Sequence, residues 1–203
     1  MHTGKRSGVM FDFILPFDLS VAGAADKLRF SCGRFLTPVM KAITLSGNVG
    51  MIFVVSAFIM LFFKKTRRFG VAALIAIALG FLFTNVILKH VIARERPFEN
   101  VSSKFYTYWK AAGALNESGY SFPSGHTTAA TAFGVSLFLH TKKRCSWLFL
   151  AIPAVMGFTR IYFVVHYASD ILGGFIAGSA AAVIAYFIVA AAKRLIRSDG
   201  SGT

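Results

Sequence analysis

The chain has 203 residues, of which 56% are hydrophobic and 15% are charged, and it carries a formal net charge of +14. Soluble domains average about 25% charged residues, so this composition argues against a water-soluble globular protein. An excess of Lys and Arg can indicate a nucleic-acid partner, but here these residues flank long apolar segments, as at the cytoplasmic ends of membrane helices. We therefore expect a single domain, residues 1-203, whose partner is the lipid bilayer and not nucleic acid.

The N-terminal segment, residues 1-41, mixes apolar and charged residues. Between Asp18 and Lys41 the charges are Asp26, Lys27, Arg29, Arg34 and Lys41. This pattern favours an amphipathic helix or helix pair lying on the membrane surface. A sixth membrane span is the alternative, because long charged side chains near helix ends can extend to the interface. We expect no cleavable signal peptide, because Asp12 interrupts the short apolar run and no small-residue cleavage site follows.

Five later stretches are apolar over the roughly 20 residues that a membrane-spanning helix requires. They are Ala42–Phe63, Phe69–Leu88, Ser124–Thr141, Ser146–Val165 and Ile171–Ala192. We therefore predict an all-α fold, a polytopic transmembrane helix bundle of five to six spans with an N-terminal amphipathic helical segment. Within the single domain, residues 1-41 are the interfacial segment, 42-192 the transmembrane core and 193-203 a cytoplasmic tail.

Basic residues cluster in three places between and after these spans. They are Lys64, Lys65, Arg67 and Arg68, then Lys142, Lys143 and Arg144, and finally Lys193, Arg194 and Arg197. Five spans place all three clusters on one face, which the positive-inside rule assigns to the cytoplasm. The long connection 89-123 and the turn 166-169 then lie on the extracytoplasmic side. Tyr106, Tyr108, Trp109 and Tyr120 in the long connection suit either the lipid headgroup region or packing within the loop.

Three polar segments fall at this extracytoplasmic face. They are Lys89–Pro97, Tyr120–Thr127 and Thr159–Asp170. Each contains groups that an apolar span does not need, and the predicted topology brings all three to the same side of the membrane. We therefore expect them to form one site.

Cationic groups in these segments favour an anionic ligand. Lys89, Arg96 and Arg160 concentrate positive charge, and guanidinium groups match phosphate oxygens bidentately. Arg160 stands inside an apolar stretch, where a charge is costly unless it meets an anion or a polar cavity. Ser124 and Gly125 lie where a loop becomes a helix, and helix N-termini bind phosphate through unpaired N–H groups. A serine that only caps the helix is the alternative.

Two histidines and one carboxylate could supply the chemistry. His166 and Asp170 are four residues apart, so on a helix they share a face and the carboxylate can fix the imidazole tautomer for nucleophilic attack. His126 is then suited to protonate a leaving oxygen. His90 and His140 have no acidic partner and are assigned no role. No metal and no cofactor are expected, because three cations would repel a divalent ion.

Together these residues resemble the three signature motifs of the type 2 phosphatidic acid phosphatase family. The motifs are Lys89-x6-Arg96-Pro97, Pro123-Ser124-Gly125-His126 and Thr159-Arg160-x5-His166-x3-Asp170. The resemblance implies that His166 attacks phosphorus to form a phosphohistidine, that Asp170 orients it and that His126 protonates the departing oxygen. It also implies a set of phosphate-binding residues: Lys89, Arg96, Arg160, Ser124 and Gly125.

The resemblance further implies an integral membrane phosphatase of lipid phosphate or lipid diphosphate monoesters, multi-pass in the cell membrane, with an extracytoplasmic active site. Phosphatidylglycerophosphate, phosphatidic acid and undecaprenyl diphosphate remain open as substrates, and Thr159 stands where the family usually has serine. Vanadate-dependent haloperoxidases and non-catalytic lipid-phosphate binding or transport proteins are the alternatives. The spacing Gly174-x3-Gly178 predicts close helix packing within or between chains, which leaves the oligomeric state open. Residues Phe98–Gly119 could form a lid.

Overall fold

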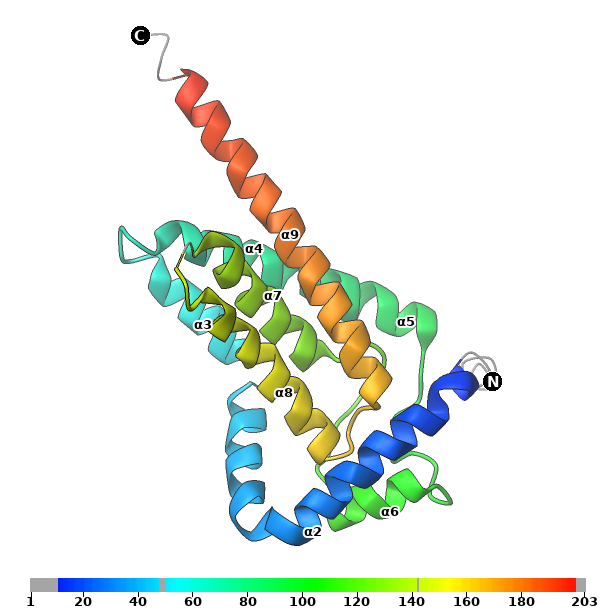
Figure 1. The fold of residues 1–203 in the computed structure, drawn as a ribbon. Coiled ribbons are helices and arrows are strands. Elements are labelled where there is room, and N and C mark those ends of the chain that lie inside the picture. The colour runs from blue at the N-terminus through cyan, green and yellow to red at the C-terminus, as the bar shows by residue number, and fades with distance from the viewer. Residues whose placement is uncertain (1–10, 48–49, 142, 200–203) are drawn as a thin grey trace.

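The structure is a computed structural model that describes residues 11–47, 50–141 and 143–199, and within those ranges its regular structure is entirely helical (Figure 1). The first half comprises η1 (Asp12–Ile14), α2 (Leu15–Ser46), α3 (Met51–Met60), α4 (Arg67–Phe81), the π-helical η3 (Leu82–Leu88) and α5 (Lys89–Ile92). The second half comprises α6 (Lys104–Ala111), α7 (Gly125–His140), η4 (Ser146–Leu150), α8 (Ala151–Tyr162) and α9 (Ala168–Asp199). The predicted all-α fold is confirmed.

The centre of the bundle is formed by α4, α7 and α9, which all contact one another. Their crossings are lined by buried small residues: Ala73, Ala76, Ala130, Ala132, Ala182 and Ala185. Hydrophobicity alone does not hold helices together in lipid, so close packing of small residues is the usual means of association. Phe53, Phe133 and Met156 fill the remaining space of this core.

Two glycines let α9 approach α7 closely. A Cβ added at Gly178 would lie 2.6 Å from the Thr128 carbonyl oxygen, and one at Gly174 would lie 2.9 Å from the Ser124 carbonyl oxygen. The predicted packing role of this glycine spacing is therefore realised within the chain.

We expect the substitution Gly178→Ala to lower the melting temperature of the detergent-solubilised protein, because backbone atoms of α7 cannot yield to the new methyl group. Overpacking of this kind costs about 1–3 kcal/mol. Ala180→Leu, which adds more volume at an exposed position of α9, is the control and should leave the melting temperature unchanged. Equal melting curves for the two variants would contradict the tight α7–α9 contact.

Two helical stretches are long and apolar enough to cross a membrane, which makes the chain a membrane protein. Arg67–Ile92 has 26 residues with a mean hydropathy of 2.5, and Ala168–Leu195 has 28 residues with a mean hydropathy of 2.2. The bent pair Asp12–Ser46 and Met51–Met60 is a third candidate, and Ser146–Tyr162 is a shorter apolar helix. Large apolar side chains face outward on several helices, among them Phe58, Val86, Ile176 and Phe187. In lipid such a surface is stable, whereas in water it would promote association.

The first predicted span, Ala42–Phe63, is not one straight helix. α2 ends at Ser46 and α3 begins at Met51. Gly50 before α3 has a φ of +72°, a left-handed conformation that glycine adopts at little cost. A hydropathy window of about 20 residues does not register such a break, because the apolar residues on both sides outweigh Ser46, Gly47 and Gly50.

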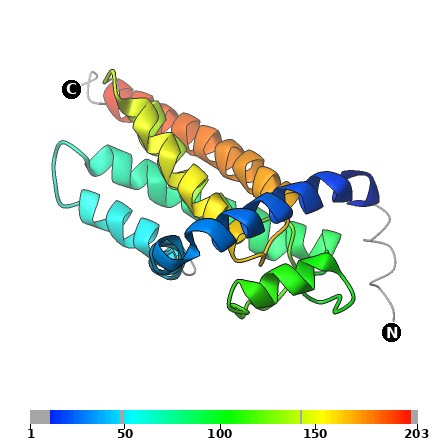
Figure 2. The ribbon, with the colours of Figure 1, turned by 60° about the horizontal axis from the view of Figure 1, so that its bottom comes forward.

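The predicted amphipathic stretch from Asp18 to Lys41 lies within one helix, α2, which contains Pro38, is bent and packs against the protein (Figure 1). Its charges are not all exposed as the pattern suggested: Asp18 is 1% exposed and Arg29 is 8% exposed. Arg29 donates a hydrogen bond of 2.6 Å to the carbonyl oxygen of Tyr162 in α8. The half of α2 before the bend lies beside α6 across one end of the bundle (Figure 2). Partners so distant along the chain are invisible to a local sequence pattern.

Candidate active site

The three polar segments meet at one end of the bundle, where α5 ends, α7 begins and α8 turns into α9 (Figure 1). A cavity of about 250 Å³ opens there. Its polar wall includes Lys89, Arg96, Glu117, Ser118, Gly125, His126 and His166. Its apolar wall is formed by α4 and α7, through residues such as Ile77, Phe81 and Ala129. The cavity thus has a cationic end and an apolar side.

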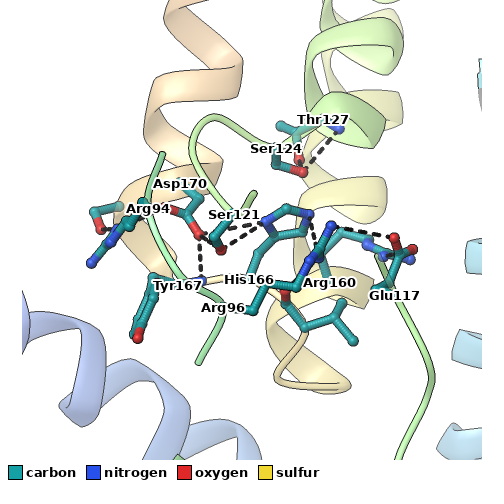
Figure 3. Close-up of polar contacts among 12 residues, drawn as sticks. Arg94, Arg96, Glu117, Ser121, Ser124, Thr127, Arg160, His166, Tyr167 and Asp170 are labelled. Atoms are coloured by element: carbon teal, nitrogen blue, oxygen red, sulfur yellow. Dashed lines mark hydrogen bonds and ion pairs between the residues drawn. The ribbon is translucent and has the colours of Figure 1, made fainter. Parts of the chain in front are cut away.

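His166 lies at the centre of the polar contacts, with Asp170 on one side and Arg96 and Arg160 on the other (Figure 3). Its Nδ1 is 3.4 Å from Oδ2 of Asp170, and its Nε2 is 3.4 Å from Nη1 of Arg96. A carboxylate facing Nδ1 favours the tautomer that carries its proton there, which leaves the Nε2 lone pair on the cavity side. The predicted contact between His166 and Asp170 is therefore present, and their roles as nucleophile and orienting group stay a prediction.

Asp170 belongs to the first turn of α9 and is fully buried. Its Oδ2 accepts hydrogen bonds from the Ser121 hydroxyl at 2.5 Å and from the Tyr167 N–H at 2.9 Å. Its Oδ1 accepts one from Arg94 at 2.6 Å. A carboxylate bound by this many donors has little freedom to rotate, which fixes the direction in which it faces His166.

The pKa of His166 is held well below its ordinary value. Burial is the largest cause, and the positive charges of Arg96, Arg160 and Lys89 act in the same direction, while Glu117 opposes them. Burial and nearby cations both disfavour imidazolium. The imidazole is therefore neutral at physiological pH, as a nucleophile must be.

Arg96 is almost completely buried and is anchored by backbone carbonyls of two loops. It donates to Gly119 and Ser118 at 2.8 Å each and to Val165 at 2.9 Å. These bonds tie the loop after α6 to the turn before α9. They also fix the guanidinium beside His166, at the position expected of a phosphate-binding group.

Arg160 and Arg96 both face the carboxylate of Glu117. Arg160 forms a close ion pair with one oxygen of Glu117, and Arg96 lies 3.5 Å from the other. Burial alone would raise the pKa of Glu117, but Arg160 and Arg96 outweigh it, so the pKa lies below the ordinary value and the group is ionised. Arg160 also donates to the Thr44 hydroxyl at 2.5 Å, and its Nε is buried without a partner among the described residues.

Of the residues at the start of α7, some line the cavity and others do not. Gly125 and His126 line it, whereas the Ser124 hydroxyl is buried and accepts hydrogen bonds from the N–H and the hydroxyl of Thr127. Ser124 is thus the N-cap of α7, the alternative that the sequence left open. A Cβ at position 125 would lie 3.1 Å from Oδ1 of Asn85, so the glycine keeps this wall close to the π-helical turn of η3.

Several polar residues of the site were not assigned from the sequence: Asp18, Thr44, Arg94, Glu117 and Ser121. Arg94 and Ser121 lie within the polar segments but between the motif positions. Glu117 lies in the connection after α6, where only the lid hypothesis pointed to the site. Among the described residues, no three His, Cys, Asp or Glu side chains come together in a way that could hold a metal ion.

Trp109 in the long connection packs against other residues of the loop. The Trp109 ring stacks on Phe98 with centroids 4.7 Å apart, and its Nε1 donates to the Leu115 carbonyl at 2.9 Å. Of the two readings for Trp109, loop packing is confirmed. The packing of Trp109 supports the segment after α6 that places Glu117 in the wall of the cavity.

Comparisons with known proteins agree with this geometry. The family model described as the PAP2 superfamily matches residues 69–194. The undecaprenyl-diphosphatase of Sulfolobus acidocaldarius is 31% identical over 60% of this chain and 55% of its own length. Phosphatidylglycerophosphatase B of Bacillus subtilis is 30% identical over 76% of this chain and 74% of its own length. The aligned part thus spans little more than half of the archaeal relative and about three quarters of the bacterial one.

A solved structure has a similar overall fold. The crystal structure of a transmembrane PAP2 type phosphatidylglycerolphosphate phosphatase from Bacillus subtilis superposes with a TM-score of 0.64 and 25% sequence identity. The superposition covers 94% of this chain and 92% of that one. The similarity therefore includes the N-terminal helix, which lies outside the residues that the family model matches.

Proposed function

The chain belongs to the PAP2 superfamily, and from that membership we propose that it is an integral membrane phosphatase that hydrolyses lipid phosphate or lipid diphosphate monoesters. The observation that carries the proposal is His166, a neutral imidazole held between the buried Asp170 carboxylate and a cationic cavity. The names of the two relatives, an undecaprenyl-diphosphatase and a phosphatidylglycerophosphatase, support a lipid substrate. The apolar wall of the cavity supports it as well, because a lipid chain can lie there while its phosphate meets the cations.

In the proposed mechanism, Nε2 of His166 attacks phosphorus, and the bond between phosphorus and the departing oxygen breaks. His126, which lines the same cavity, donates a proton to that oxygen. The imidazole gains positive charge in the phosphohistidine, and Asp170 stabilises this charge through Nδ1–H. A water molecule then attacks phosphorus while His126 accepts its proton, the bond between phosphorus and Nε2 breaks with its electron pair returning to His166, and inorganic phosphate is released.

Phosphate oxygens are held in this proposal by the residues that the motifs predict. Lys89, Arg96 and Arg160 offset the negative charge that builds up in the transition state. Gly125 exposes its backbone to the cavity, and Ser124 contributes through the N-terminus of α7, which it caps. The unpartnered Nε of Arg160 is a donor that a phosphate oxygen would satisfy.

We place the site on the extracytoplasmic side of the membrane. The connection between α3 and α4, the connection between α7 and η4, and the end of α9 gather at the opposite end of the bundle (Figure 1). These segments carry the basic residues Lys64, Lys65, Arg67, Arg68, Lys143, Arg144, Lys193 and Arg194, which the positive-inside rule assigns to the cytoplasm. We propose one domain over residues 1-203 with five crossings and with the first half of α2 at the outer surface. Its position beside α6 supports this arrangement (Figure 2).

The proposal is tested by phosphate release from a panel of lipid phosphates in detergent, with EDTA present. The panel contains phosphatidylglycerophosphate, phosphatidic acid and undecaprenyl diphosphate, with a water-soluble phosphate monoester as the reference for lipid dependence. We expect turnover of at least one lipid in EDTA and much slower turnover of the soluble ester. No release from any lipid, or release that EDTA abolishes, would contradict the proposed metal-free lipid phosphatase.

The depressed pKa of His166 gives an expected pH dependence. An ordinary histidine becomes protonated as the pH falls through about 6.5, but here burial and the three cations keep the imidazole neutral to lower pH. We therefore expect the ¹³Cε1 resonance of His166, assigned by its loss in His166→Asn, to show no titration near pH 6.5. A resonance that titrates at or above pH 6.5 would contradict the electrostatic description of the site.

A further inference from the structure

Behind the His166–Asp170 pair lies a buried ion network whose other charged members, Arg94 and Asp18, are not motif residues. Arg94, 5% exposed, donates from Nη1 to Asp170 at 2.6 Å and to the Ser169 hydroxyl at 2.7 Å. From Nη2 it donates to Oδ2 of Asp18 at 2.9 Å. Arg94 is the only cation of the described chain that pairs with Asp170, and it approaches the oxygen opposite to the one that faces His166.

The guanidinium of Arg94 is also fixed between two aromatic rings. Its central carbon lies 3.8 Å from the ring centroid of Tyr167 and 4.1 Å from that of Phe11. Rings at these distances attract the cation and restrict its plane. The plane of the Arg94 guanidinium is therefore fixed, with Nη1 toward Asp170 and Nη2 toward Asp18.

Asp18 reaches this network from α2, a helix outside the residues that the family model matches. It is 1% exposed. Its Oδ1 accepts from the Ser169 N–H at 2.7 Å, and its Oδ2 accepts from the Ser169 hydroxyl at 2.7 Å as well as from Arg94. Ser169 immediately precedes Asp170, so Asp18 holds both the arginine and the helical turn that carries the site's carboxylate.

We propose that Arg94 and Asp18 are positioning residues for the phosphatase reaction and act on His166 through Asp170. The inference rests on the proposed function. Arg94 sets the rotation of the Asp170 carboxylate, and Asp18 fixes Arg94 and the first turn of α9 together. The formal charges of Asp18, Arg94 and Asp170 sum to −1, which leaves one negative charge to balance the imidazole when phosphorylation makes it positive.

The role differs from that of a buried ion pair that only ties helices together. Arg29 provides the comparison: it is a buried arginine of α2, it bonds to Tyr162 and Asp26, and it touches no member of the network around Asp170. If α2 mattered only for packing, losing Arg29 and losing Arg94 would have similar effects on turnover.

The test uses the full-length protein in detergent and compares the wild type with Arg94→Gln, Arg94→Lys, Asp18→Asn and the control Arg29→Gln. For each protein, kcat, KM, inhibition by inorganic phosphate, the single-turnover rate of phosphohistidine formation and the melting temperature are measured. Phosphate inhibition reports binding by the cationic cavity, whereas phosphohistidine formation reports the alignment of His166.

We expect Arg94→Gln to lower kcat and the rate of phosphohistidine formation by about 100-fold, the upper end of what the loss of a supporting partner costs. Asp18→Asn should lower both by about 10-fold, because asparagine can still accept from the Ser169 N–H but offers Arg94 no carboxylate. Arg94→Lys should recover part of the loss, since a lysine can still pair with Asp170. KM and phosphate inhibition should stay within about twofold.

Unchanged kcat in Arg94→Gln, an equal loss in Arg29→Gln, or a parallel weakening of phosphate inhibition would overturn the inference. If Arg94→Gln does not fold, the same criteria apply to Asp18→Asn and Arg94→Lys. An inactive wild type would overturn the proposed function and this inference with it. An active wild type with fully active Arg94 and Asp18 variants would overturn the inference alone.

Discussion

Replacing His166 with alanine is expected to lower kcat by about 10⁴-fold or more, because no other group can form the covalent intermediate. Among the described histidines, only His166 pairs with a carboxylate, with Nδ1 3.4 Å from Asp170. Its Nε2 faces Arg96 at 3.4 Å, where a phosphate held by the cavity would lie within reach. The measurement is phosphate release together with trapping of labelled enzyme, since phosphohistidine survives alkali and is lost in acid.

Two further substitutions, His90→Ala and His126→Ala, make the test of His166 more specific. His90→Ala is the matched control: His90 is exposed, its Nδ1 contacts the Val86 carbonyl at 3.1 Å, and it does not line the cavity. It should leave kcat within about twofold of the wild type. His126→Ala should slow lipid substrates strongly, whereas an ester with a good leaving group should still form the phosphohistidine rapidly, because that step then needs no proton donor. Turnover of His166→Ala within about 100-fold of the wild type would disprove its role as nucleophile.

The helical fold follows from the sequence wherever apolar runs are uninterrupted. α9 lies on the predicted span Ile171–Ala192 because this stretch has no charge and its glycines allow contact with α7. The break around Gly50 and the bend of α2 were not predicted, because a span is recognised by its hydropathy, and hydropathy does not register the tendency of Gly47, Gly50 and Pro38 to interrupt a helix. α2 packs against both α6 and α8.

The residues of the site also divide into those that the sequence predicts and those that it does not. Arg96, His126, His166 and Asp170 could be assigned because each stands at a motif spacing, and a spacing fixes which side chains share a helix face or a helix end. Glu117 could not, because its position depends on how the loop after α6 folds back toward Arg96. Asp18 shows the same limit, since its partners Arg94 and Ser169 are distant in the chain.

Arg160→Gln is expected to reduce kcat/KM by about 10²–10³-fold, equivalent to about 3–4 kcal/mol of transition-state stabilisation. Arg160 is 1% exposed, and its two terminal nitrogens contact Thr44 and Glu117. Arg160→Lys keeps the charge but not the planar fork, so we expect it to recover only part of the loss. The measurement is kcat/KM for the best lipid of the panel, with vanadate inhibition as a second readout of anion binding.

The contact with Glu117 allows a second explanation, in which Arg160 serves only to neutralise that carboxylate. A double-mutant cycle separates the two. If neutralisation is the whole role, Glu117→Gln removes the need for it, and Arg160→Gln with Glu117→Gln should regain nearly wild-type kcat/KM. If Arg160 binds phosphate, the double variant stays as impaired as Arg160→Gln, and Glu117→Gln alone strengthens phosphate inhibition, because both arginines are then free for the ligand. We expect the second pattern. Arg96 and Arg160 both pair with Glu117, and Arg96 also contacts His166, next to which the phosphate of a substrate must bind in order to be attacked.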